Sequence, residues 1–215
     1  MPDCPLCQSL CRAFKTLALG AGGKDDAVQM AERLLEVNDL RAGFATPEGF
    51  VRAVDGVSFE IRRGEVLGLV GESGCGKTVT ALTLLRLLPR PPAVIEGGQA
   101  LFHGWDLLTM PTEELRTVRG GKIGMIFQEP MTALSPLHRI GDQLAEAARL
   151  HRALSAAEAW ALGLEWLKRV GLPDAEQRMK DYPHQLSGGM RQRVMLAMTM
   201  LPEPELIIAD EPTTA

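Results

Sequence analysis

The clearest chemical signal in the chain is a glycine-rich loop, Gly71-Glu72-Ser73-Gly74-Cys75-Gly76-Lys77-Thr78. It fits G-x-x-x-x-G-K-[ST], and it lies between an apolar run over residues 66–70 and a helical pattern over residues 78–88. Glycines let the backbone curl so that N–H groups converge on an anion. Lys77 can reach the β- and γ-phosphates, and the Thr78 hydroxyl can bind Mg²⁺. The loop predicts a nucleotide site, without choosing between a kinase, a GTPase and an ATPase. The residues expected to contact this nucleotide are Gly71, Glu72, Ser73, Gly74, Cys75, Gly76, Lys77, Thr78 and Val79.

Two acids, Asp210 and Glu211, follow a second apolar run over residues 206–209. The carboxyl end of a strand is where a parallel α/β sheet places its ligand-binding groups. Asp210 would reach Mg²⁺ directly or through water, and Glu211 would polarise the water that attacks the γ-phosphate. Such a pair taken alone is often a solvated edge, but its combination with the phosphate loop favours a catalytic role.

A second anion site is predicted by Leu186-Ser187-Gly188-Gly189-Met190-Arg191-Gln192-Arg193. Ser187 is placed to cap a helix, and Gly188 and Gly189 leave the first backbone amides exposed. A single nucleotide does not need two phosphate-binding helix ends from one chain. Two chains arranged head to tail could supply one each.

An α/β fold must position these groups. A helical insertion falls between two of its sheet strands, and its apolar stripes (Ile140, Leu144 and Ala148, then Trp160, Leu164, Leu167 and Val170) indicate packing faces. Val57, Phe59 and Ile61 alternate as on one face of a strand that ends at a turn over residues 62–65. The expected strands cover residues 31–40, 51–61, 66–70, 123–127 and 206–209. The expected helices cover residues 78–88, closed by Pro89 and the Pro91-Pro92 pair, and residues 188–201, with the helical insertion at about 132–190.

The composition narrows the class of protein. The 215 residues are 46% hydrophobic and carry a formal net charge of -4, which excludes nucleic-acid binding through bulk positive charge. No apolar run approaches the roughly 18 residues that span a bilayer, and the start of the chain is a poor secretory signal, so we expect a soluble cytosolic chain. Cys4, Cys7 and Cys11 could hold a metal but have no nearby fourth ligand. We favour a poorly ordered extension over residues 1–32.

Taken together, the motifs resemble the ABC-type ATPases: residues 71–78 as Walker A, 206–211 as Walker B and the L-S-G-G-M-R-Q-R run as the signature. Gln128, in Ile126-Phe127-Gln128-Glu129-Pro130, resembles the Q-loop glutamine. Alone it could belong to any surface loop, but its place after a strand and before the helical insertion favours the motif. The resemblance implies that Gln128 contacts the Mg²⁺ site and links it to a membrane partner. The metal ligands so implied are Thr78, Gln128 and Asp210.

Finer features resemble the oligopeptide and dipeptide importer branch, whose close relatives carry nickel: residues 71–74, residues 127–136 and Tyr182-Pro183-His184-Gln185. The implied fold is a P-loop NTPase with a central, mostly parallel sheet, an N-terminal antiparallel part and a helical insertion. The implied function is that of an ATP-binding subunit that energises an importer of dipeptides or oligopeptides by hydrolysing ATP, with Mg²⁺, in a head-to-tail dimer. The implied partners are a second ATPase subunit, transmembrane permease subunits and, indirectly, an extracytoplasmic solute-binding protein, with no nucleic acid. The implied location is peripheral, on the cytoplasmic face of the inner membrane.

An aromatic side chain stacks on adenine in this family, upstream of Walker A. Phe44 fits best, and Phe50 is the alternative. Stacking on a base is worth about 1–3 kcal/mol in nucleic-acid sites.

The sequence departs from the family after Glu211, because it stops at Ala215. The family continues with a dimer-contacting loop, further strands and a switch histidine, whereas His103, His138, His151 and His184 all precede Walker B. We expect one nucleotide-binding domain over residues 33–215 that lacks its C-terminal strands. The alternatives are an incomplete piece of a working ATPase, a hydrolysis-defective fragment, or a soluble ABC-type ATPase acting on ribosomes or DNA.

Overall fold

The computed structural model describes residues 33–127 and 133–211. It divides into two compact units at Thr117, and each unit is described by itself. The predictions for residues 1–32, including the three clustered cysteines, and for Gln128 lie outside the described residues.

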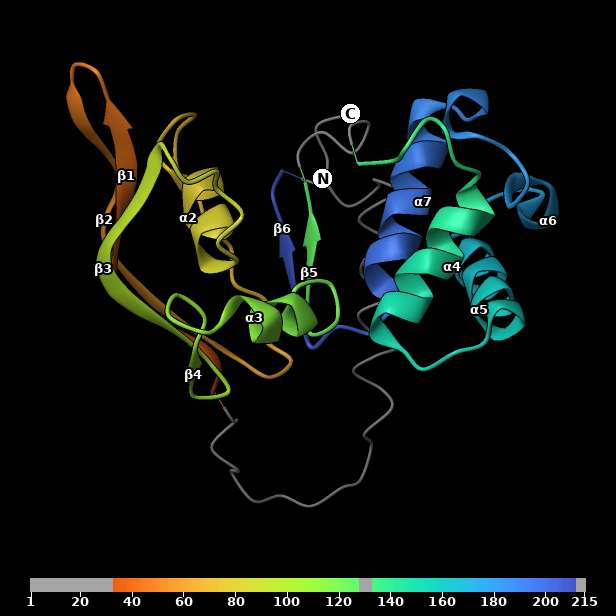
Figure 1. Ribbon diagram of the computed structural model, residues 1–215, viewed down its shortest axis with the longest axis horizontal. Coiled ribbons are helices and arrows are strands. Elements are labelled where there is room, and N and C mark those ends of the chain that lie inside the picture. Colours follow the sequence, from red (N-terminus) through yellow and green to blue (C-terminus); the bar gives the residue numbers. More distant parts are fainter. Residues whose placement is uncertain (1–32, 128–132, 212–215) are drawn as a thin grey trace. The chain divides into compact units, whose positions relative to one another are not determined.

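The first unit contains a four-stranded antiparallel sheet with the order β2-β1-β3-β4 (Figure 1). Strands β1 and β2 form a long hairpin whose turn joins Thr46 to Gly49, and the apolar residues Leu35, Val37 and Leu40 of β1 are buried. This sheet confirms the expected N-terminal antiparallel part. Its strands are β1 (Arg33–Thr46), β2 (Gly49–Arg62), β3 (Ala93–Phe102) and β4 (Trp105–Asp106).

Helix α2 (Lys77–Leu84) follows the phosphate loop and packs against β1 and β2. It ends four residues before the expected Leu88. Arg86 adopts a left-handed backbone with φ 51, and the amides of Arg86 and Leu87 donate to the carbonyls of Thr83 and Leu82 at 2.9 Å each. This is a Schellman cap, which ends a helix by satisfying its last carbonyls. The cap ends α2, so the expectation that the prolines close it is wrong.

Residues 66–70 do not form the buried strand that their apolar character predicted. Val66 is 85% and Val70 is 94% exposed. A β-strand requires a neighbouring strand that pairs with its backbone N–H and C=O groups. The four-stranded sheet of this unit does not include residues 66–70. The expectation is therefore wrong for this structure.

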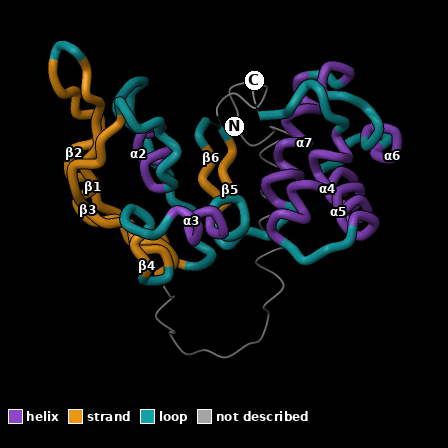
Figure 2. Tube along the Cα trace, in the orientation of Figure 1, coloured by secondary structure: helices purple, strands orange, loops and turns teal. Residues whose placement is uncertain are grey.

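The second unit contains the parallel pair β5 (Ile123–Ile126) and β6 (Leu206–Ala209), which lie side by side in Figure 1. Both strands match their expected positions. The helical insertion is also confirmed, and Figure 2 shows its long helices beside one another. The helices of this unit are α4 (Ile140–His151), α5 (Ala156–Arg169), α6 (Ala175–Arg178) and α7 (Gly188–Met200), and α3 (Thr112–Val118) spans the division between the units.

The core of the second unit is formed by the apolar stripes that the spacing predicted. Ile140, Leu144 and Ala148 of α4 are fully buried, and α5 contributes Leu167. Helices α4 and α5 cross closely where the Trp160 ring lies against Gly141. A β-carbon at Gly141 would touch that ring, so the crossing requires glycine.

His151, the last residue of α4, should make the stability of the fold depend on pH. Its ring lies over Gly120 and Gly121, and burial lowers its pKa below the usual 6.5. As the pH falls through 6.5, His151 is protonated in the unfolded chain before it is protonated in the folded chain. The free energy of unfolding therefore decreases as the pH falls. We expect the urea midpoint to drop between pH 7.5 and pH 5.5, and to drop less in His151→Gln. Above pH 7 the difference between the two proteins should be constant; parallel curves across the whole range would contradict this assignment.

Candidate functional site

The phosphate loop belongs to the first unit, where Lys77 is bonded to the loop itself. Its Nζ donates to the carbonyls of Gly71 and Glu72 at 2.9 Å each, and it lies 3.8 Å from the Cys75 sulfur. The ammonium group is therefore held over the loop, at the place from which it could meet a phosphate oxygen.

Two glycines give the loop its curvature. Gly74 and Gly76 have φ values of 82° and 95°, in a region of backbone conformation that residues other than glycine rarely adopt. A β-carbon at Gly76 would collide with the Ala53 carbonyl, whereas the space beside Gly74 is open. Helix α2 starts directly after Gly76 with no side-chain cap. The loop thus offers a concave turn of backbone beside an uncapped helix start, which is the arrangement that binds phosphate.

Asp210 and Glu211 follow β6 in the second unit. The Asp210 amide donates to the Ile126 carbonyl at 2.9 Å, which extends the pairing of β5 and β6 by one residue. Asp210 is buried, and the exposed Glu211 has a left-handed backbone with φ 47. The acids therefore stand beside the carboxyl end of β5, the strand that leads toward Gln128.

The signature begins helix α7 as the sequence predicted. Ser187 is the N-cap, and its hydroxyl accepts from the Met190 amide at 3.4 Å. Gly188 and Gly189 are exposed with open space beside their α-carbons. The Arg191 Nε donates to the Leu186 carbonyl at 3.0 Å, which ties the helix to the preceding turn. An exposed helix start with bare glycines can receive an anion from outside the chain.

Both candidate adenine-stacking rings lie on the antiparallel sheet. Phe44 is half-buried in β1, between Val51 of β2 and Ala93 of β3. Phe50 is more exposed, and its ring lies across Gly43. Phe44 remains the expected adenine contact, with Phe50 as the alternative.

Oxygen donors at these motifs suit Mg²⁺. Thr78 is an exposed residue with a hydroxyl and Asp210 is a buried residue with a carboxylate, and Mg²⁺ prefers hard oxygen ligands of these kinds, completed by phosphates and water. Within residues 33–127 and 133–211, no group of three or more His, Cys, Asp or Glu side chains could hold a metal without such help.

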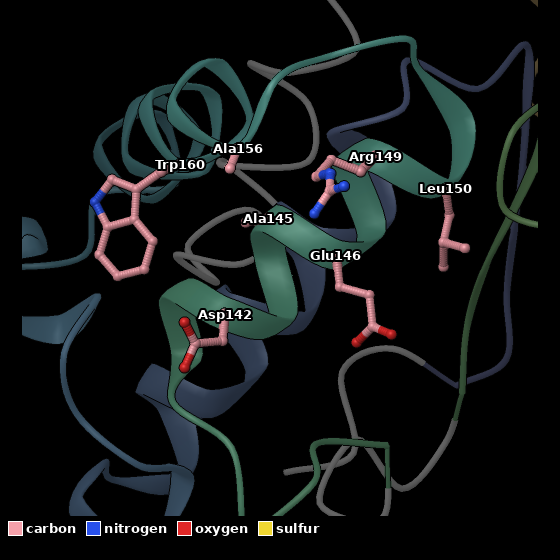
Figure 3. A pocket seen from close by; sticks show the side chains of 7 residues that line it. All are labelled: Asp142, Ala145, Glu146, Arg149, Leu150, Ala156 and Trp160. Carbon is pink, nitrogen blue, oxygen red and sulfur yellow. The ribbon is translucent and has the colours of Figure 1, made fainter.

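A pocket of about 580 Å³ lies on α4 and the start of α5 (Figure 3). None of the residues expected to bind nucleotide lines it. Asp142 and Glu146 project from α4, and Trp160 closes the side formed by α5. Its lining residues are Asp142, Ala145, Glu146, Arg149, Leu150, Ala156 and Trp160.

Comparison with known proteins identifies the family. Residues 54–214 match the family described as "ABC transporter", and this chain belongs to that family of P-loop ATPases. The solved dimeric structure of MJ0796, a bacterial ABC transporter cassette, has a TM-score of 0.73 and 27% identity, with 84% of this chain and 75% of that chain covered. A second structure of MJ0796, in a post-hydrolysis state bound to ADP and Pi, matches equally well.

The similar relatives are named for peptide transport. The oligopeptide transport ATP-binding protein OppD of Salmonella typhimurium is 53% identical over 189 residues, which are 88% of this chain and 56% of that protein. The probable peptide ABC transporter ATP-binding protein y4tR of Sinorhizobium fredii is 53% identical over 86% of this chain and 55% of its own length. The dipeptide transport ATP-binding protein DppD of Bacillus subtilis is 49% identical over the same shares. The chain thus spans about half the length of these relatives. Among the described residues, no helix is long and apolar enough to cross a membrane.

Proposed function

We propose that this chain is the ATP-binding part of an ABC importer subunit that hydrolyses ATP to energise peptide uptake. The observation that carries the proposal is a pair of candidate anion sites that are far apart in the sequence, a phosphate loop before α2 and an exposed, glycine-bearing start of α7. Two ATP molecules would lie between two chains, each held by the phosphate loop of one chain and Ser187–Gly189 of the other.

Each group has a distinct task in the proposed reaction. Lys77 leaves its loop carbonyls for the β- and γ-phosphate oxygens, while the loop amides hold the remaining charge. Thr78, Asp210 and Gln128 would hold Mg²⁺, which supplies positive charge to the phosphates when bound. Glu211 accepts a proton from the attacking water, and the residues need only position and neutralise the reacting groups.

Peptide uptake is supported by the names of the relatives, which describe peptide transport, and by the importer-like motifs over residues 127–136 and 182–185. The proposed partners are a second ATPase subunit, transmembrane permease subunits and, through them, an extracytoplasmic solute-binding protein. We place the chain peripherally on the cytoplasmic face of the inner membrane, with Gln128 linking the nucleotide site to the permease.

Dimerisation in the presence of Mg²⁺ and ATP tests this proposal. Ser187→Arg should weaken the dimer by at least about tenfold, because a long cation fills the start of α7 where the partner's phosphate would enter. ATP binding by the monomer should be unchanged, since its phosphate loop is intact. Sedimentation and a fluorescent ATP analogue measure the two quantities.

The matched control is Ser155→Arg, which removes the N-cap serine of α5. Both substitutions cost the fold about 1 kcal/mol of capping. Only the change at Ser187 should affect the dimer; equal effects, or an unchanged Ser187→Arg dimer, would contradict the head-to-tail arrangement.

A further inference from the structure

The first amides of α4 are capped by the chain segment that leads into the signature. The Ile140 amide donates to the Asp181 carbonyl at 2.9 Å, and the Gly141 amide donates to the Met179 carbonyl at 2.8 Å. The N-cap residue Arg139 supplies no side-chain bond to this helix start. Because a helix cannot bond its own first amides, these carbonyls fix the start of α4 to residues 179–181.

Close packing makes these two bonds possible. A β-carbon at Gly141 would lie 2.7 Å from the Met179 carbonyl oxygen, well inside contact distance. Met179 is itself buried, and its methyl group reaches Gly163 of α5. Residues 179–181 are thus held against both α4 and α5 and cannot shift without breaking the caps.

Asp181 holds this segment through its carboxylate. The side chain is 8% exposed, and it accepts from the Arg178 guanidinium at 2.7 Å and from the Gln177 amide at 3.0 Å. Hydrogen bonds to a buried carboxylate are strong, and losing the carboxylate leaves the guanidinium only the more distant Asp174, at 4.0 Å. Asp181 thereby fixes the turn that follows α6.

The same segment continues into the signature. The Tyr182 amide donates to the Gln185 side chain at 2.8 Å, and the Leu186 amide donates to the Pro183 carbonyl at 3.1 Å, within the 3-10 helix η3 (Pro183–Gln185). The Arg139 guanidinium lies 6.0 Å from the centre of the Tyr182 ring. Buried Leu186 then precedes Ser187 directly. The starts of α4 and α7 are thus joined by one short, bonded segment.

The turn before α4 is tied to the same helix. Gln143 of α4 accepts from the Ser135 amide at 2.9 Å and donates to the carbonyls of Ser135 and His138 at 3.0 Å each. This turn begins three residues after residue 132, the end of the segment that contains Gln128. A continuous set of contacts therefore runs from that turn, through α4 and residues 179–181, to Ser187.

We infer that Asp181 is a positioning residue for the signature. By holding residues 179–181 on the first turn of α4, its carboxylate sets the direction in which Ser187 and Gly189 face the partner's nucleotide. The inference rests on the proposed head-to-tail dimer. It adds that a side chain outside the signature motif determines the orientation of the signature.

The first test separates binding from turnover. In Asp181→Ala, affinity for a non-hydrolysable ATP analogue and KM should stay within twofold, because the phosphate loop is untouched. The kcat, counted per analogue-binding site, should fall at least about tenfold, since a small misplacement of a reacting group is costly. Counting sites removes any unfolded fraction from the result.

Asp174→Ala is the matched control. Asp174 also faces Arg178, but at 4.0 Å and with a side chain that is 78% exposed. Its kcat should stay within twofold of the parent. A parent-like kcat in Asp181→Ala, or an equal loss in Asp174→Ala, would overturn the inference.

Mixing variants gives a readout that a merely structural defect would not produce. Asp181→Ala chains keep their phosphate loop, and Lys77→Ala chains keep their signature, so a mixed dimer contains one intact composite site. The mixture of the two variants should hydrolyse ATP faster than either variant does alone. The reference mixture is Ser187→Arg with Lys77→Ala.

The two mixtures distinguish the possible failures. If the reference mixture regains activity and the Asp181→Ala mixture does not, Asp181 has only a structural role. If the reference mixture stays inactive, the head-to-tail dimer is wrong and the inference falls with it. If Asp181→Ala does not fold, Asp181→Asn replaces it, because asparagine keeps the volume and one acceptor oxygen. Its kcat should fall by less, and activity should again recover on mixing with Lys77→Ala. An unchanged kcat, or no recovery on mixing, would overturn the inference.

Discussion

Replacing Lys77 by alanine should reduce ATP hydrolysis by at least about a hundredfold, the scale seen when one preorganised charge donor is removed from a reacting oxygen. Nucleotide affinity should fall as well, because the ammonium group is the mobile cation of the loop. It now bonds to the Gly71 and Glu72 carbonyls, so its removal also loosens the loop that must receive the phosphates. Titration with a fluorescent ATP analogue and a phosphate-release assay measure the two effects.

Lys122→Ala is the control for this prediction. Lys122 is an exposed lysine whose ammonium group lies 3.7 Å from Glu205, and it is not part of the phosphate loop. Its loss should leave binding and hydrolysis near the parent values, as expected for a surface ion pair. If Lys77→Ala retained more than about a tenth of the parent activity, the assignment of the phosphate loop would be wrong.

Glu211→Gln should separate binding from hydrolysis. The substitution keeps the shape of the side chain but removes the carboxylate that accepts the proton from water, and such general bases contribute about 10²–10⁴ in rate. Hydrolysis should fall by that factor while ATP affinity stays within about threefold. In the proposed dimer reopening depends on hydrolysis, so the variant should accumulate as an ATP-bound dimer in sedimentation experiments.

The same change at Glu205 provides the comparison. Glu205 stands before β6, at the opposite end of the strand that leads to Glu211, and is paired with Lys122. Glu205→Gln should hydrolyse ATP at the parent rate and form no persistent dimer. A Glu211→Gln protein as active as its parent would exclude Glu211 as the base.

Local signals explain which elements could be predicted from the sequence. Ser187 caps α7 where the serine and the two glycines indicated a helix start, and β6 ends at the acids that marked its boundary. The stripe of Ile140, Leu144 and Ala148 is buried because a spacing of four places these residues on one face of α4. In each case the information lies within about one or two helical turns of the residue.

Long-range partners explain the failures. Residues 66–70 have the composition of a buried strand, but the neighbour that a strand needs is set by topology rather than by composition. The end of α2 was missed because Arg86, rather than glycine, takes the left-handed position; its guanidinium donates to the Met110 carbonyl at 2.5 Å, a contact 24 residues away. Neither feature has a recognisable local pattern.

Asp181 was missed for a related reason. Its spacing of three from Arg178 is that of an ordinary surface ion pair, and nothing nearby in the sequence indicates that the adjoining carbonyls cap α4. The caps depend on Gly141 approaching Met179, residues 38 positions apart in the chain. The folded structure is needed to recognise this contribution.

Because Lys77 is hydrogen-bonded to its own loop, binding of a nucleotide exchanges one set of acceptors of the ammonium group for another. Two carbonyl oxygens of the loop accept hydrogen bonds from the ammonium group and hold it in place. An arriving phosphate must outcompete these carbonyls, and a neutral mimic of its shape has no charge with which to do so. Selectivity for anionic ligands thus follows from the contacts of Lys77 within its own loop.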